Sequence, residues 1–133
     1  MKMDYIDKII VHCTASEWAN LDVVRKWHVE DNGWSDIGYH FLIENCYPTW
    51  YSYKKQKPNF VNDGLLSEGR PIDKSGAHAK GQNKHSIGIC LVGNDSFTGK
   101  QIDTLLDLLV RLCDRFDLDE THIYGHRDFS KKA

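Results

Sequence analysis

The chain lacks any long block of charge of one sign. Its 133 residues include 17 lysines and arginines and 19 aspartates and glutamates, which gives a formal net charge of −2. Proteins that bind the phosphate backbone of nucleic acids usually concentrate basic side chains on one face or in one run. We therefore expect no nucleic-acid partner.

A long apolar run is also lacking. Residues 1–8 contain Asp4 and Asp7, where a secretory signal requires an uninterrupted apolar stretch. Nowhere does the chain approach the roughly 20 apolar residues that span a bilayer as a helix. We expect no membrane insertion, and synthesis in the cytoplasm without a signal peptide.

Cysteines are few, and no two of them form a CxxC pair. Disulfide frameworks belong mostly to short secreted domains, and metal or redox motifs place cysteines close together. The wide spacing favours free thiols, although it leaves a disulfide open. The cysteines are Cys13, Cys46, Cys90 and Cys113.

Short apolar runs alternate with longer stretches of helical periodicity, which predicts one α/β domain over residues 1–133. Apolar residues recur at helical spacing from Leu21, where Asn20 can cap the first turn, towards Gly33. A longer apolar stripe begins near Thr98 and predicts a helix to Phe116. The expected strands are residues 6–12, 39–43, 87–92 and 121–124.

Several ordered motifs give the chain a family resemblance. They resemble the motifs of the type 2 family of zinc-dependent N-acetylmuramoyl-L-alanine amidases, whose fold is shared by phage lysozymes and peptidoglycan recognition proteins. The resemblance implies a central mixed β-sheet flanked by helices. The motifs are Ile-Ile-Val-His at 9–12, Asp-Ile-Gly-Tyr-His-Phe at 36–41, Gly-Ala-His-Ala-Lys-Gly at 76–81, His-Ser-Ile-Gly-Ile at 85–89 and Gly-His-Arg-Asp at 125–128.

The resemblance implies that His12 and His126 bind one zinc ion, and each follows an expected strand. Catalytic zinc usually has three protein ligands and one open position. In the family a cysteine just beyond the position of Ala133 supplies the third ligand, so we expect a chain truncated before it. The carboxylate of Ala133 remains open as a substitute. Cys13 is a poor one, because neighbours on a strand point to opposite faces.

The resemblance also assigns catalytic and substrate-binding residues. Tyr39 and Lys132 match residues that stabilise the negative charge developing on the carbonyl oxygen. His78 and Asn83 match positions that line the cleft for the stem peptide. Without the motifs, Tyr39 would be interpreted as a half-buried strand residue, Lys132 as a solvated side chain and His78 as a turn residue.

Other histidines show no signal of a functional role. For His28 and His40 the sequence indicates only packing, and His85 is equally unremarkable. His122 alternates in register with His126, but the family pattern favours a structural role for it.

Residues 45–63 depart from the short polar turn that the family usually has at this place. The segment is rich in aromatic residues and lysines. It could stack on sugar rings, but we favour an inserted hairpin whose aromatic residues pack onto the domain.

The resemblance implies hydrolysis of the amide between N-acetylmuramic acid and L-alanine in peptidoglycan, by a monomer that reaches the bacterial wall once it is released. An alternative from another class is a peptidoglycan-binding module whose impaired metal site does not turn over. A third possibility, a regulatory protein that binds a polymerase, has no support in the charge pattern.

Overall fold

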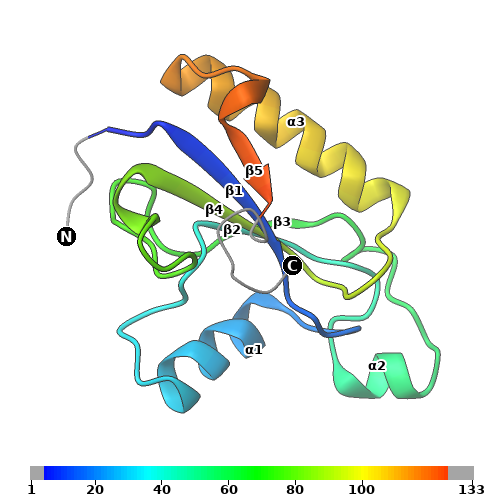
Figure 1. Cartoon of the computed structure of the whole chain (residues 1–133). Helices are drawn as coiled ribbons and strands as arrows, with labels where there is room; N and C mark the ends of the chain where they lie inside the picture. The colour runs from blue at the N-terminus through cyan, green and yellow to red at the C-terminus, as the bar shows by residue number, and fades with distance from the viewer. Residues whose placement is uncertain (1–4, 126–133) are drawn as a thin grey trace.

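A five-stranded β-sheet forms the centre of the computed structural model, which describes residues 5–125 (Figure 1). The strand order is β3-β2-β4-β1-β5. The β2–β3 pair is antiparallel, and the other three pairs are parallel. This mixed sheet confirms the expected α/β fold. The strands are β1 (Lys8–Cys13), β2 (Phe41–Ile43), β3 (Leu66–Glu68), β4 (Ser86–Leu91) and β5 (Ile123–Gly125).

β1 and β4 are the longest strands and lie in the interior of the sheet. Every residue of β4 is buried, as expected for a parallel strand that is covered on both faces. The two strands pair with His12 opposite Cys90, and Cys90 in turn pairs with Leu42 of β2. This register places the end of β1 beside the ends of its parallel neighbours.

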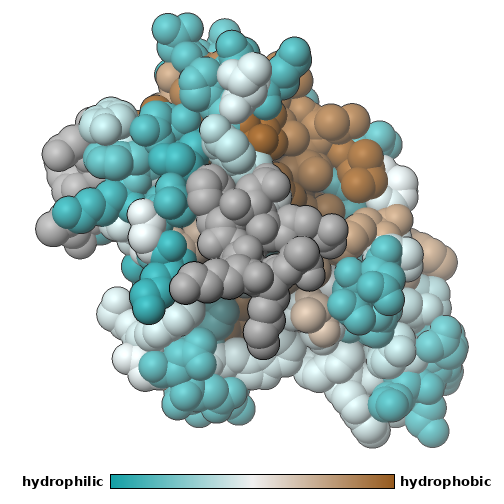
Figure 2. Space-filling view, in the orientation of Figure 1, coloured by the Kyte–Doolittle hydropathy of each residue, from teal (hydrophilic) through white to brown (hydrophobic). Residues whose placement is uncertain are grey.

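Helix α3 (Gly99–Phe116) covers one face of the sheet (Figure 1). Thr98 caps its first turn in a capping box with Gln101, as the pattern near Thr98 predicts. The buried Gln101 amide also donates to the backbone oxygens of Ile43 and Val92, which fixes the helix to the sheet. The outward side of α3 carries an exposed apolar patch, visible in Figure 2, that includes Ile102, Leu106 and Val110.

Helix α1 (Leu21–Lys26) lies against the opposite face and continues into a π-helical turn, η1 (Trp27–Asp31). The Asn20 side chain accepts a hydrogen bond from the backbone of Val23, which confirms the expected cap. Val24 is buried in a second apolar cluster with residues of β2 and β4. Gly33 follows with φ +72°, in the left-handed region that ends helices.

Expected strand boundaries need small corrections. β1 begins at Lys8 rather than Ile6, and β2 begins at Phe41, so Tyr39 precedes the strand. Residues 121–122 lie in the 3₁₀ turn η3 (Glu120–His122), because the Asp119 carboxylate caps that turn. Another 3₁₀ turn, η2 (Asn83–His85), precedes β4.

The expected hairpin at residues 45–63 is wrong. The segment contains helix α2 (Trp50–Lys54), which begins at a capping box between Thr49 and Ser52. Trp50 and Tyr51 are each 56% exposed, so more than half of each residue faces solvent. Tyr47 and Tyr53 are half-buried and pack against each other, with ring centroids 5.6 Å apart.

All four cysteines are free thiols, as the spacing predicts. Within residues 5–125, no helix has the length and apolar character needed to cross a membrane.

Candidate active site

Three of the predicted site residues lie at one cavity of about 870 Å³. His12 comes from the end of β1, Tyr39 from the segment before β2, and His78 from the loop before β4. The rings of Tyr39 and His78 have centroids 5.2 and 4.9 Å from that of His12. Residues 27 and 66 positions away in the sequence thus converge on His12, which is only 7% exposed.

A chain of hydrogen bonds links Ser86 to His12 through His78. The Ser86 hydroxyl donates to the backbone oxygen of Gln82 at 2.6 Å, so it accepts from His78 Nε2 at 3.2 Å. His78 Nδ1 is then the acceptor for the N–H at His12 Nε2, at 2.8 Å. In the neutral ring His12 Nδ1 carries the lone pair, which is the form that binds a metal ion.

The loop that carries His78 is shaped by Asn83 and by two glycines. Asn83 Oδ1 accepts from the backbone N–H groups of His78 and Ala79, at 2.8 and 2.9 Å. A Cβ atom at Gly76 or Gly88 would lie 2.6 Å from the His78 ring, so both positions require glycine. The structure therefore gives Asn83 a role in holding His78.

Tyr39 stays protonated in this environment. Burial raises the pKa of its phenol well above the usual value, and the neighbouring Cys90 thiol raises the pKa further. A phenol in this state is a hydrogen-bond donor. It is suited to stabilise negative charge that develops on a substrate oxygen.

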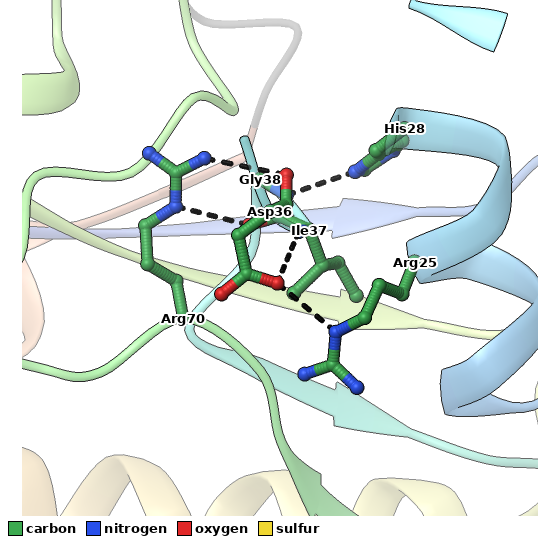
Figure 3. Close-up of polar contacts among 6 residues, drawn as sticks. All are labelled: Arg25, His28, Asp36, Ile37, Gly38 and Arg70. Atoms are coloured by element: carbon green, nitrogen blue, oxygen red, sulfur yellow. Dashed lines mark hydrogen bonds and ion pairs between the residues drawn. The ribbon is translucent and has the colours of Figure 1, made fainter. Parts of the chain in front are cut away.

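The segment just before Tyr39 is held by a polar network (Figure 3). The Asp36 carboxylate accepts from Arg25 Nε at 3.0 Å and from the backbone N–H of Ile37 at 2.7 Å. Gly38 donates its backbone N–H to His28 Nδ1 at 2.8 Å. Arg70 approaches from the other side and donates to the backbone oxygens of Asp36 and Ile37. The network thus fixes the backbone immediately before Tyr39.

His40 is a structural residue beneath the site. It is buried, accepts from the backbone N–H of Gly88 through Nδ1 at 3.0 Å, and donates from Nε2 to the Lys74 backbone oxygen at 2.7 Å. Burial lowers the pKa of His40 and of His28, and the nearby Arg70 charge lowers both further. The sequence predicts packing for both residues, but the hydrogen bonds depend on distant contacts that carry no local signal.

Not all expected residues fall within the described part of the chain. His126, Lys132 and Ala133 lie outside residues 5–125. Cys13 is exposed and lines the same cavity as His12, with Sγ 4.0 Å from the Asn94 backbone oxygen, although the two neighbours alternate along β1.

One of the two predicted zinc ligands, His12, lies among the described residues. Among the described residues no group of three or more His, Cys, Asp or Glu side chains could hold a metal ion. His12 nevertheless fits a zinc ligand, because its Nε2–H is bound to a second histidine and its Nδ1 is the unprotonated nitrogen.

Comparison with known proteins gives concordant matches. The chain is 34% identical over 144 residues to the endolysin of Klebsiella phage KP32, covering 99% of this chain and 82% of that protein. It is 36% identical over 138 residues to the endolysin of Escherichia phage T7, covering 96% and 78%.

A similar solved structure is the complex of tracheal cytotoxin with the ectodomains of peptidoglycan recognition proteins LCa and LCx. Its TM-score is 0.78 at 28% identity, covering 99% of this chain and 77% of the other. The profile described as N-acetylmuramoyl-L-alanine amidase matches residues 2–133. The chain therefore belongs to the N-acetylmuramoyl-L-alanine amidase family.

Proposed function

We propose that this protein is a zinc-dependent peptidoglycan hydrolase that cleaves the amide between N-acetylmuramic acid and L-alanine. The observation that carries the proposal is the convergence of His12, Tyr39 and His78 on one cavity in a chain of the amidase family. The substrate is the peptidoglycan of a bacterial wall, which the protein reaches after release from the cell that makes it.

His12 and His126 are the residues that we assign to hold one zinc ion. When bound, zinc activates a water molecule and polarises the scissile carbonyl. The protein prepares this site through His78, which accepts a hydrogen bond from the Nε2–H of His12 and orients its ring. Ser86 in turn orients His78.

Tyr39 and Lys132 are assigned to the transition state. The Tyr39 phenol remains protonated because of its burial, so it can donate a hydrogen bond to the carbonyl oxygen as that oxygen gains charge. Lys132 would add a positive charge to the same oxygen. A donor that strengthens its bond only in the transition state raises turnover more than binding.

The cavity beside His78 is assigned to the stem peptide. Its lining combines apolar side chains such as Val11 and Phe97 with polar groups from His12 and Asn94. Such a mixture is typical of sites that bind a ligand in one orientation. Asn83 contributes by holding the backbone of the loop on which His78 lies.

A peptidoglycan-binding module without turnover is the second candidate. It is favoured by the similarity to recognition proteins whose solved complex contains tracheal cytotoxin. The same cavity would then hold a muramyl peptide without cleaving it.

The test is digestion of purified peptidoglycan followed by mass spectrometry of the products. We expect intact glycan strands and free stem peptides that begin with L-alanine, with loss of activity after chelation and in His12→Ala. Cleavage between sugars or within the stem peptide would contradict the proposed bond. Binding without any cleavage, in the presence of added zinc, would favour the second candidate.

A further inference from the structure

His28 makes a contact that packing alone does not explain. Its Nδ1 accepts a hydrogen bond from the backbone N–H of Gly38 at 2.8 Å, and its ring contacts the rings of Trp34 and Tyr39. The ring centroids are 4.7 Å from Trp34 and 5.3 Å from Tyr39. The π-helical turn η1 therefore presents a hydrogen-bond acceptor to the residue that precedes Tyr39.

The Gly38 backbone connects two parts of the site. Its N–H is bound by His28, and its carbonyl oxygen accepts from the N–H of Ala77 at 3.0 Å. Tyr39 follows Gly38 in the sequence, and His78 follows Ala77. A displacement of Gly38 would consequently move both segments.

The atoms packed around Gly38 leave little room for it to move without moving its neighbours. A Cβ atom at Gly38 would lie 2.2 Å from the Ala77 backbone oxygen and 2.9 Å from the Trp34 ring. The backbones of the two segments are thus in direct contact at this position. Movement at one is transmitted to the other through packed atoms.

Arg70 holds the same two segments from the other side. Its guanidinium donates to the backbone oxygens of Asp36 and Ile37 in one segment, at 3.3 and 3.0 Å (Figure 3). It also donates to the backbone oxygen of Ser75 in the other segment, at 2.8 Å. Arg70 thus binds carbonyl oxygens of both segments, whereas the Gly38 N–H is bound by His28. In Figure 3 the two side chains approach the loop from different elements.

We propose that His28 is a positioning residue for the amidase reaction, because its imidazole nitrogen holds Gly38 and thereby sets the relative placement of Tyr39 and His78. This inference rests on the proposed function. His28 does not touch the reacting atoms. Its action is transmitted through one peptide group to the phenol on one side and to the partner of His12 on the other.

Position 28 has two requirements that histidine meets. The side chain must accept a hydrogen bond from Gly38 while its ring packs against Trp34 and Tyr39. A neutral imidazole does both, whereas a protonated one would present an N–H to another N–H. Burial and the Arg70 charge lower the pKa of His28, which maintains the accepting form.

The kinetic test compares two substitutions at this position on a soluble muramyl peptide with zinc present. His28→Phe keeps a ring but removes the acceptor, so we expect kcat to fall on the order of 10- to 100-fold with KM little changed. His28→Asn places an amide oxygen where Nδ1 lies and should recover most of kcat. His85→Phe, the same change at a half-buried histidine stacked on Tyr5, should leave kcat unchanged.

A second measurement does not depend on activity. Amide hydrogen exchange by NMR should show lost protection at Gly38 in His28→Phe, restored in His28→Asn, with shifted side-chain signals from Tyr39 and His78. Unchanged Gly38 protection and Tyr39 signals in His28→Phe would overturn the inference, and so would a kcat no better in His28→Asn than in His28→Phe. If the wild-type chain cleaves no muramyl peptide, the proposed function fails, while the NMR comparison still decides whether His28 positions the two segments.

Discussion

The two faces of strand β4 differ in what they contribute. Ile87, Ile89 and Leu91 point towards α3 and belong to an apolar cluster with Leu108 and Leu112. Gly88 and Cys90 alternate with them and lie on the other face, beneath His78, His40 and Tyr39. The odd-numbered residues of β4 thus face α3, with Leu91 also lining the cavity, and the even-numbered residues face the histidines and the second apolar cluster.

This difference shows how a small domain holds a polar site without losing its core. On the α3 face, burial of aliphatic side chains supplies stability in proportion to the area removed from water. On the site face, histidines lie beside the second apolar cluster, and their ring nitrogens are bound to backbone groups or to each other. Within residues 5–125 every buried side-chain nitrogen or oxygen has a hydrogen-bond partner. The site face is therefore specific at little cost to folding.

The largest expected effect is on the α3 face. Ile89→Ala removes a fully buried side chain and should lower the free energy of unfolding by about 2–5 kcal/mol. Turnover per folded molecule should not change, because Ile89 points away from the site. Denaturant unfolding and an amidase assay at low temperature measure the two quantities. A large fall in turnover by the folded fraction would show that the faces are not independent.

Tyr39→Phe tests the site face. Removal of one hydrogen-bond donor to a developing negative charge should lower kcat about 100-fold. The Kd for a muramyl peptide should change little, because the phenol acts mainly in the transition state. Titration calorimetry and steady-state kinetics give the two values. An equal loss in binding and turnover would contradict the assigned role.

Mild acid should affect stability through the site face. The pKa values of His28 and His40 are lowered in the folded protein from the ordinary value of 6.5, so the unfolded chain takes up protons first as the pH falls. Stability should be fully present above pH 6.5 and should decline below it. Carboxylates titrate mainly near pH 4. Between that pH and pH 6.5, histidines therefore determine how the free energy of unfolding changes with pH. Unfolding curves measured across this range should be less pH-dependent in His28→Asn. If the free energy of unfolding changed with pH equally in the variant and the wild type, His28 would not contribute to the pH dependence.

The smallest expected effect is at the start of α3. Thr98→Ala removes the cap on the Gln101 backbone N–H and should cost about 1 kcal/mol of stability. Turnover should remain at the wild-type value. A loss of turnover without a loss of stability would show that the cap also positions Ile102 and Leu105, which line the cavity.

The sequence predicts the strongly periodic parts of this fold well. The α3 stripe and the β4 run come within about one residue of their observed bounds, because their patterns extend over several turns or alternations. Helix α2 is missed, since Trp50, Tyr51 and Tyr53 favour strands and only the capping box of Thr49 and Ser52 indicates a helix.

The candidate site is predictable where the motifs name residues and not where it depends on tertiary contacts. His12, Tyr39 and His78 are found from their motifs, and the structure brings them together. The bond between His12 and His78 and the bond between His28 and Gly38 require the folded arrangement of distant segments. No spacing in the sequence contains that information.

The most direct test of the account is the zinc content of the purified chain after metal loading and dialysis, compared with His12→Ala. We predict one zinc ion per wild-type chain and almost none in His12→Ala, with unchanged circular dichroism in both, since the α3 face maintains the fold. A wild-type chain that retains no zinc, or a His12→Ala chain that retains as much as the wild type, would contradict a metal site built on the polar face of the sheet.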